Sequence, residues 1–144
     1  MITVATAEEM HRLGKKLSAH LRAGDLVLVN GPLGAGKTVF AQGLGAGLGI
    51  TGIASPTFVI SRVHKATVPF IHVDAYRLVD SENPNLYLDD LDLDIAGSIT
   101  LIEWGGAESA RLSQDRLEIT IDRSDDVRKV EITPIGSRWA EFSL

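Results

Sequence analysis

The sequence of 144 residues contains no cysteine. This absence excludes disulfide bridges, thiolate metal sites and cysteine nucleophiles, and it is typical of a reducing compartment. No apolar run approaches the roughly 20 residues that a membrane-spanning helix needs. Residues 1–9 lack the basic and then apolar layout of a signal peptide. We therefore expect a cytoplasmic protein that does not contact a membrane.

A surplus of positive charge is also missing. The chain has 14 lysines and arginines against 19 aspartates and glutamates, which gives a net charge of −5. A protein that binds nucleic acid without a partner usually has a surplus of basic residues, because much of its affinity comes from neutralising phosphates. If this protein serves an RNA process, we expect something else to hold most of the RNA.

No internal repeat and no low-complexity linker divides the chain. Hydrophobic residues make up 44% of it and charged residues 23%, as in ordinary globular proteins. A chain of this length buries about two-thirds of its unfolded surface without disulfides or metals. We predict that residues 1–144 form a single domain.

Residues 31–38 read Gly-Pro-Leu-Gly-Ala-Gly-Lys-Thr and fit the phosphate-binding loop G-x-x-x-x-G-K-[ST]. The apolar, β-branched segment 25–30 before them predicts a buried strand, and the apolar spacing over 38–48 predicts a helix. In such a loop the backbone N–H groups and the helix N-terminus hold phosphate oxygens. Lys37 would reach the β- and γ-phosphates of a nucleotide, and the Thr38 hydroxyl would bind Mg²⁺. The alternative is a glycine-rich turn with an exposed lysine.

Residues 99–104 predict another apolar strand, and this one ends in a carboxylate, Glu103. In phosphate-loop folds an acidic residue lies at the carboxyl end of a neighbouring parallel strand, close to the Mg²⁺. Glu103 is therefore a candidate for metal positioning or water activation, and its alternative is a surface carboxylate. His72, Asp74 and Tyr76 would share one face of an earlier strand, which a sheet edge with a polar face explains about as well.

The other patterns complete an α/β fold: a P-loop NTPase-like mixed sheet flanked by helices, with antiparallel strands at its edges. The glycine-rich stretch 43–49 lacks nucleotide-fingerprint spacing and indicates close helix packing followed by a glycine C-cap. The acidic stretch 80–94 predicts a short helix and a solvated turn. The remaining elements are strands at 2–4, 59–63, 69–73, 116–122, 127–133 and 139–142, and a helix from a capping box at Thr6 and Glu9 to about Gly24. The strands after residue 115 are expected to extend the sheet in antiparallel fashion.

Four segments together resemble the TsaE family, also called YjeE. They are the loop at 31–38, Ser-Pro-Thr-Phe at 55–58, His-Val-Asp-Ala-Tyr-Arg at 72–77 and Ile-Glu-Trp at 102–104. The resemblance implies an ATPase needed for bacterial N6-threonylcarbamoyladenosine formation at position 37 of tRNAs that read codons starting with adenine. It also implies that the protein acts together with the TsaB–TsaD pair, which carries the transferase activity. The protein would then contact tRNA mainly through these partners.

The resemblance carries roles to individual positions. Lys37, Asp74 and Glu103 would be catalytic, and Thr38 and Glu103 would contact Mg²⁺. Contacts near the adenine or ribose would fall in 5–7 and 127–128. The ATP-binding residues would be Leu33, Gly34, Ala35, Gly36, Lys37, Thr38 and Trp104.

Two departures from the family pattern, Pro32 and the pair Gly105 and Gly106, bear on partner contacts more than on nucleotide binding. No arginine stands out as a catalytic finger; Arg62, Arg77 or a partner residue could complete the site, which predicts slow hydrolysis by the protein alone. Two other functions stay open: a small-molecule kinase on the same loop, and a nucleotide-gated interaction module. A GTPase is disfavoured because the sequence has no N-K-x-D element, which would recognise guanine.

Overall fold

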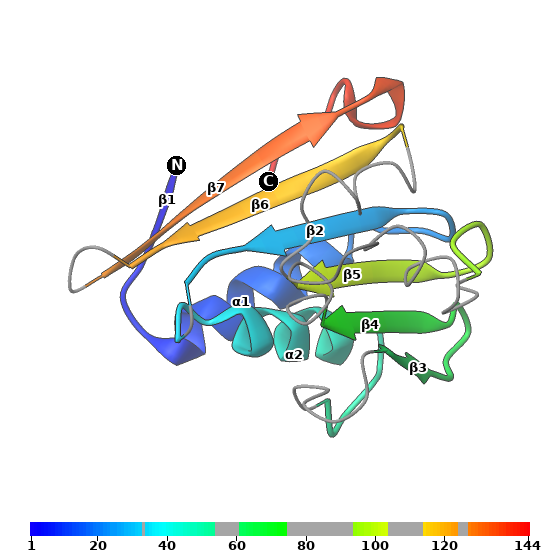
Figure 1. Cartoon of the computed structure of the whole chain (residues 1–144), viewed down its shortest axis with the longest axis horizontal. Helices are drawn as coiled ribbons and strands as arrows, with labels where there is room; N and C mark the ends of the chain where they lie inside the picture. Colours follow the sequence, from blue (N-terminus) through cyan, green and yellow to red (C-terminus); the bar gives the residue numbers. More distant parts are fainter. Residues whose placement is uncertain (33, 54–60, 75–93, 104–113, 124–126) are drawn as a thin grey trace, which may run out of the picture.

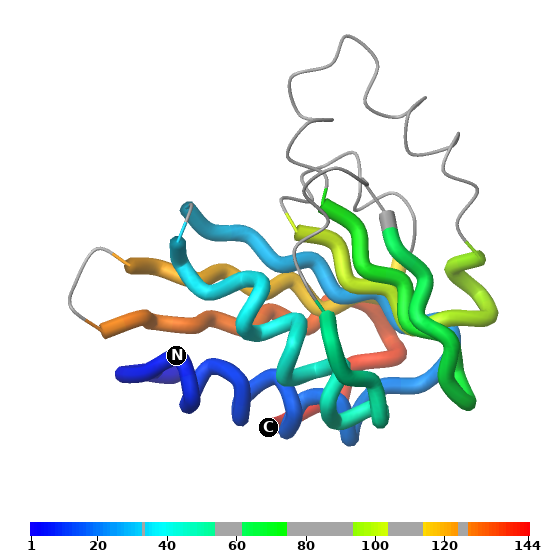
Figure 2. Tube along the Cα trace, turned by 90° about the horizontal axis from the view of Figure 1, so that it is seen from below, coloured from blue at the N-terminus to red at the C-terminus, as the bar shows by residue number. Residues whose placement is uncertain are grey.

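In the computed structural model the described residues are 1–32, 34–53, 61–74, 94–103, 114–123 and 127–144. They form a seven-stranded mixed sheet with two α-helices on one face (Figures 1 and 2). The elements are β1 Ile2–Val4, α1 Ala7–Ser18, β2 Leu26–Asn30, α2 Lys37–Gly47, β3 Ser61–His64, β4 Phe70–Asp74, β5 Ile99–Glu103, β6 Arg116–Asp122, β7 Arg128–Ile135 and the 3₁₀ helix η1 Ser137–Trp139.

The strand order is β1-β7-β6-β2-β5-β4-β3. The four central strands β6, β2, β5 and β4 are parallel, whereas β1, β7 and β3 pair in antiparallel fashion at the edges. The predicted mixed sheet with antiparallel edges is therefore confirmed. One detail was wrong: β6 runs parallel to β2 and antiparallel only to β7. Twelve residues separate the end of β5 from the start of β6, and a connection of that length is enough for a parallel crossover to the other side of β2.

Central strands of a parallel sheet are buried on both faces, which is why β2 and β5 are almost continuously apolar. On the face covered by α1 and α2, the sheet contributes alternate residues such as Val27, Val29 and Leu101. The helices contribute the other half of this core, chiefly Met10, Leu13, Leu17, Phe40, Ala41 and Leu44. Burial of this apolar surface is the main force that holds the helices on the sheet.

Glycines allow the backbones of α1 and α2 to approach closely. A Cβ atom added at Gly43 would lie 1.9 Å from the carbonyl oxygen of His11, and one at Gly14 would lie 2.2 Å from that of Phe40. Gly49, with φ of +82°, follows the last turn of α2 as a glycine C-cap, and Ile50 N–H donates to the carbonyl of Gly45. The interpretation of 43–49 as helix packing plus a C-cap is confirmed.

Helix α1 begins as predicted and ends earlier. The Thr6 hydroxyl accepts a hydrogen bond from Glu9 N–H, and the Glu9 carboxylate accepts one from Ala5 N–H. The helix ends at Ser18 instead of near Gly24, because the chain must turn there to enter β2. Gly24, with φ of +96°, makes that turn and donates its N–H to the carbonyl of Ser98.

The expected strand at 139–142 is wrong. Residues Ser137–Trp139 form η1, and the chain continues in turns in which Phe142 N–H donates to the Trp139 carbonyl. Trp139 and Phe142 are three residues apart, so they lie on one side of a helical turn. Their rings meet edge to face, with centroids 5.4 Å apart. The acidic stretch 80–93 lies outside the described residues.

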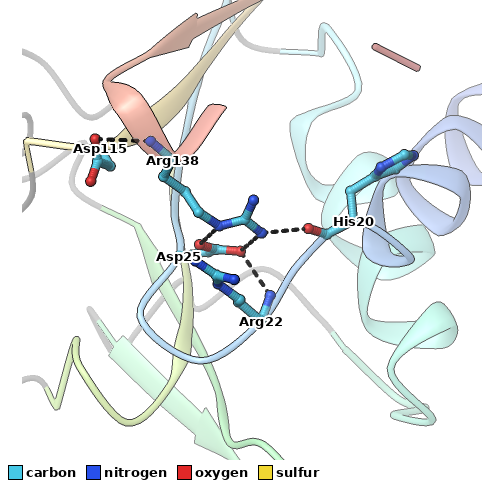
Figure 3. A network of polar contacts seen from close by, with 5 residues as sticks. All are labelled: His20, Arg22, Asp25, Asp115 and Arg138. Atoms are coloured by element: carbon cyan, nitrogen blue, oxygen red, sulfur yellow. Dashed lines mark hydrogen bonds and ion pairs between the residues drawn. The ribbon is translucent and has the colours of Figure 1, made fainter. Parts of the chain in front are cut away.

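An arginine anchors η1 to the amino edge of the parallel strands (Figure 3). The Arg138 guanidinium donates to both carboxylate oxygens of Asp25, at 3.2 and 3.1 Å, and to the His20 carbonyl at 2.9 Å. Asp25 is only 4% exposed and also accepts from Arg22 N–H. This network joins the end of α1, the start of β2 and the C-terminal segment at the edge opposite the glycine loop.

Candidate functional site

The candidate site lies where β2, β5 and β4 end, at the left in Figure 1. In the parallel register Val29 of β2 is paired with Glu103 of β5, and Glu103 with Asp74 of β4. The glycine loop leaves β2 at the same edge and leads into α2. Ligands of open α/β sheets bind at the carboxyl ends of the strands, so the topology alone assigns this edge to the site.

Backbone conformation in the loop depends on glycine. Gly34 and Gly36 have φ values of +76° and +108°, a region that residues with a side chain rarely adopt. Gly36 is the N-cap of α2 and has no side chain to accept from the first-turn N–H groups. Those donors and the positive end of the helix are therefore suited to an anion such as phosphate.

Lys37 is buried, with 5% exposure, so the alternative of an exposed lysine on a plain turn is wrong. Its ammonium donates to the carbonyl oxygens of Gly31 at 2.7 Å and Pro32 at 2.8 Å. Burial lowers the pKa of Lys37, while the negative charges of Glu103 and Asp74 act in the opposite direction. The lysine therefore lies within electrostatic reach of both candidate carboxylates.

Glu103 is also buried, with 3% exposure, so the alternative of a surface carboxylate is wrong. Its Oε1 lies 3.4 Å from the Thr38 hydroxyl and its Oε2 lies 2.5 Å from His72 Nε2. Mg²⁺ takes few protein oxygens and binds them at about 2.1 Å, so that two adjacent ligands lie roughly 3 Å apart. The spacing of the Thr38 hydroxyl and Glu103 carboxylate fits such a pair.

The described residues contain no group of three or more His, Asp and Glu side chains that could hold a metal ion by themselves. A cation at Thr38 and Glu103 would therefore need oxygen ligands from another source. A nucleotide on the loop supplies phosphate oxygens at that place, as Mg²⁺ in phosphate-loop proteins requires.

His72 and Asp74 lie on β4, one strand beyond Glu103. His72 is fully buried, and β4 is flanked by β5 and β3, so the explanation of His72 as part of a polar sheet edge is wrong. Asp74 is partly exposed at the end of the strand and shares a face with His72. Tyr76 lies outside the described residues.

A cavity of about 190 Å³ opens beside the loop. Arg128 of β7 is part of its wall and donates to the Gly34 carbonyl at 3.2 Å. The stretch 5–7 forms another part, so two segments assigned near the adenine or ribose meet at the loop. The lining residues are Ala5, Thr6, Ala7, Met10, Gly34, Ala35, Gly36, Val39 and Arg128. A larger cavity, of about 360 Å³, lies beside Arg138 and Trp139 and contains none of the predicted site residues.

The sequence patterns did not predict that Arg123 lies near the loop. A Cβ atom added at Gly34 would lie 2.6 Å from Arg123 Nη1, so this side chain reaches the loop from the end of β6. Arg123 directly follows a predicted strand, but this position indicates a place near the loop only once β6 is known to lie parallel to β2 and beside it. Of the arginines considered as a finger, Arg62 is exposed on β3, and Arg77 lies outside the described residues.

The structure thus brings Lys37, Thr38, Asp74 and Glu103 together at one edge of the sheet, next to Gly34, Ala35 and Gly36. Leu33 and Trp104 lie outside the described residues. The contacts of these residues with ATP and Mg²⁺, and their part in hydrolysis, stay predictions.

The parallel central strands, the glycine loop between β2 and α2 and the acidic end of β5 define a protein with an α/β fold that is P-loop NTPase-like. Residues 4–130 match the family described as threonylcarbamoyl adenosine biosynthesis protein TsaE. The chain belongs to the TsaE family.

Individual relatives agree with this assignment. The tRNA threonylcarbamoyladenosine biosynthesis protein TsaE of Streptomyces coelicolor is 47% identical over 142 residues, which cover 91% of this chain and 94% of that protein. The protein of the same name from Mycobacterium tuberculosis is 40% identical over 130 residues, 84% of this chain and 77% of its own. The crystal structure of Bacillus subtilis YdiB superposes with a TM-score of 0.74 at 29% identity and covers 96% of this chain and 86% of that one.

No helix among the described residues has the length and apolar character needed to cross a membrane.

Proposed function

We propose that this protein is a Mg²⁺-dependent ATPase that serves N6-threonylcarbamoyladenosine formation at position 37 of tRNAs reading codons that start with adenine. The observation that carries the proposal is the meeting of Lys37, Thr38 and the buried Glu103 at the glycine loop. Membership of the TsaE family supports the pathway, because relatives at 40–47% identity carry that biosynthetic role in their names.

Binding of ATP would use the backbone N–H groups of the loop and the first turn of α2 for the phosphates. The Lys37 ammonium, now bonded to two loop carbonyls, would turn to the β- and γ-phosphates. The cavity beside Gly34 and Arg128 offers a place for the nucleoside, and the resemblance assigns Trp104 to the same nucleotide.

Thr38 and Glu103 are the residues that would hold Mg²⁺. When bound, the ion neutralises charge on the phosphate oxygens. Asp74 and Glu103 are the candidates to orient the attacking water, because both carboxylates lie near the Lys37 ammonium. Phosphoryl transfer leaves little covalent chemistry to the protein, so the site must act by positioning and by electrostatic stabilisation.

The partner would be the TsaB–TsaD heterodimer, which would also supply most of the tRNA contact. The net charge of −5 supports this division, because the chain itself has no basic surplus. Arginine fingers supplied in trans accelerate related NTPases by about 10³ to 10⁵. We therefore expect slow hydrolysis by the protein alone and faster turnover with the partners.

The test is tRNA modification over many turnovers with purified partners, with and without this protein and ATP. Lys37→Ala should abolish both MgATP binding and the repeated turnovers, while Glu103→Gln should keep much of the nucleotide binding and lose turnover. Lys15→Ala, which removes an exposed lysine of α1, is the matched control and should behave as the parent.

Parental ATP binding and hydrolysis by Lys37→Ala would contradict the proposal for the loop. Parental turnover by Glu103→Gln would remove Glu103 from the chemistry. Full support of modification by a non-hydrolysable ATP analogue would instead assign the protein to the class of nucleotide-gated interaction modules.

A further inference from the structure

We propose that His72 is a positioning residue for the site: its Nε2–H holds one oxygen of Glu103 so that the other oxygen faces Thr38. His72 lies on β4, two strands from the strand β2 that leads into the loop, and it contacts neither the loop nor Thr38 in any hydrogen bond of the described residues. The inference rests on the proposed function, because it explains how the Mg²⁺-binding carboxylate acquires its orientation.

The two oxygens of Glu103 have different partners. Oε2 lies 2.5 Å from His72 Nε2, and Oε1 lies 3.4 Å from the Thr38 hydroxyl. An ionised carboxylate only accepts hydrogen bonds, so the proposed contact with Oε2 requires that the proton is on Nε2. Rotation of the carboxylate away from Thr38 would break this charge-assisted bond inside a site where Glu103 is 3% exposed.

The histidine ring is itself held in place. His72 is fully buried, and its ring stacks on Phe70 with centroids 6.2 Å apart and planes at 17°. Phe70 in turn stacks on His64 of β3 at 6.0 Å. Within the described part of the chain Nδ1 of His72 has no hydrogen-bond partner, so the contact with Glu103 is the polar contact that this ring makes there.

Without His72 the carboxylate has a competing partner. The negative charge of Glu103 already acts on the buried Lys37 ammonium. A Glu103 side chain released from Nε2 would turn toward that ammonium and away from Thr38. Mg²⁺ affinity would then fall, while the loop could still hold phosphates. Loss of partners that orient a metal ligand typically lowers metal affinity about 10- to 100-fold.

The experiment measures the affinity of the parent and of each variant for ADP, once in the presence of Mg²⁺ and once in EDTA. Thermal unfolding without nucleotide is followed for the same proteins. His72→Phe keeps a ring to stack on Phe70 and removes the donor. His72→Gln can offer an amide N–H near the place of Nε2, whereas the shorter side chain of His72→Asn cannot. His64→Phe is the matched control, since it changes a histidine of the same ring stack that does not contact Glu103.

We expect His72→Phe and His72→Asn to reduce the Mg²⁺-dependent gain in ADP affinity at least about tenfold. Affinity in EDTA should stay within about twofold of the parent, and His72→Gln should restore most of the gain. His64→Phe should behave as the parent in both conditions.

Retention of the full gain by His72→Phe would overturn the proposal, as would an equal loss in His64→Phe. If His72→Phe does not fold, the Gln and Asn variants decide, and equal losses in these two would show that the donor at Nε2 is not the cause. Failure of the parent to bind ADP more tightly with Mg²⁺ would instead contradict the proposed function itself.

Discussion

The close contact between α1 and α2 predicts that Gly43→Ala destabilises the protein. The new Cβ atom would lie 1.9 Å from the His11 carbonyl oxygen and 2.7 Å from its carbon, which is about 1.5 Å closer than an ordinary contact. Both atoms belong to the backbone of α1, so no side-chain rotation can relieve the contact. The two helices must therefore move apart at this point.

Separation of the helices affects the core between them. Leu13, Leu17, Phe40 and Leu44 are all buried, and a gap of 0.5–1 Å already costs about a quarter to a half of the dispersion energy of each contact. Overpacking of a core typically costs about 1–3 kcal/mol, and we place Gly43→Ala at the upper end. Alanine recovers about 1 kcal/mol through its helix propensity. The net loss is about 2 kcal/mol, or roughly 4–8 °C in Tm.

Thermal unfolding followed by circular dichroism measures this effect. Gly47→Ala is a graded control: its Cβ atom would lie 1.8 Å from the Ser18 hydroxyl, which can rotate, 2.7 Å from Ser18 Cβ, which cannot, and 3.0 Å from the Lys15 carbonyl oxygen, so the nearest backbone oxygen is farther away than at Gly43. We expect its Tm to fall by less than that of Gly43→Ala. A Gly43→Ala protein that melts within 1 °C of the parent, or above it, would refute the packing argument. Nucleotide affinity should fall together with Tm in Gly43→Ala, since α2 begins at Lys37 of the loop.

Three further perturbations have expected outcomes. Arg138→Ala leaves the buried Asp25 without its guanidinium and should cost about 3 kcal/mol in unfolding free energy by urea titration; a loss below 0.5 kcal/mol would contradict this. Arg128→Ala removes a cation from the cavity wall and should weaken ATP binding about tenfold in calorimetry, unlike the exposed Lys65→Ala. Burial, with smaller contributions from the charges of His72 and Arg62, lowers the pKa of His64, so unfolding takes up a proton at low pH. Stability should therefore rise with pH up to about 6.5, and His64→Phe should flatten that rise; an unchanged pH profile would contradict it.

Local patterns were sufficient for the parts of the fold that depend on neighbouring residues. The loop motif between an apolar strand and a helix predicted β2 and α2, and the carboxylate after the largely apolar run 99–102 predicted Glu103 at the end of a parallel strand. Thr6 and Glu9 predicted the start of α1 because capping acts within one turn. The roles of the site residues followed from the motif and the family resemblance.

Other features depend on contacts between distant segments, which no local pattern contains. The parallel direction of β6 depends on how the chain returns from β5, and the placement of Arg123 beside Gly34 follows from that direction. The contact of His72 with Glu103 requires the register between β4 and β5. A strand was predicted at 139–142, but packing of Trp139 against Phe142 favours a helical turn.

The proposed function requires that ATP and Mg²⁺ bind at the loop, with the metal between Thr38 and Glu103. A crystal structure with ADP and Mn²⁺, in which anomalous scattering locates the metal, tests it most directly. We expect a manganese peak within coordination distance of the Thr38 hydroxyl and the Glu103 carboxylate, and a diphosphate against the loop amides. A nucleotide bound elsewhere, or a metal that contacts neither side chain, would contradict it.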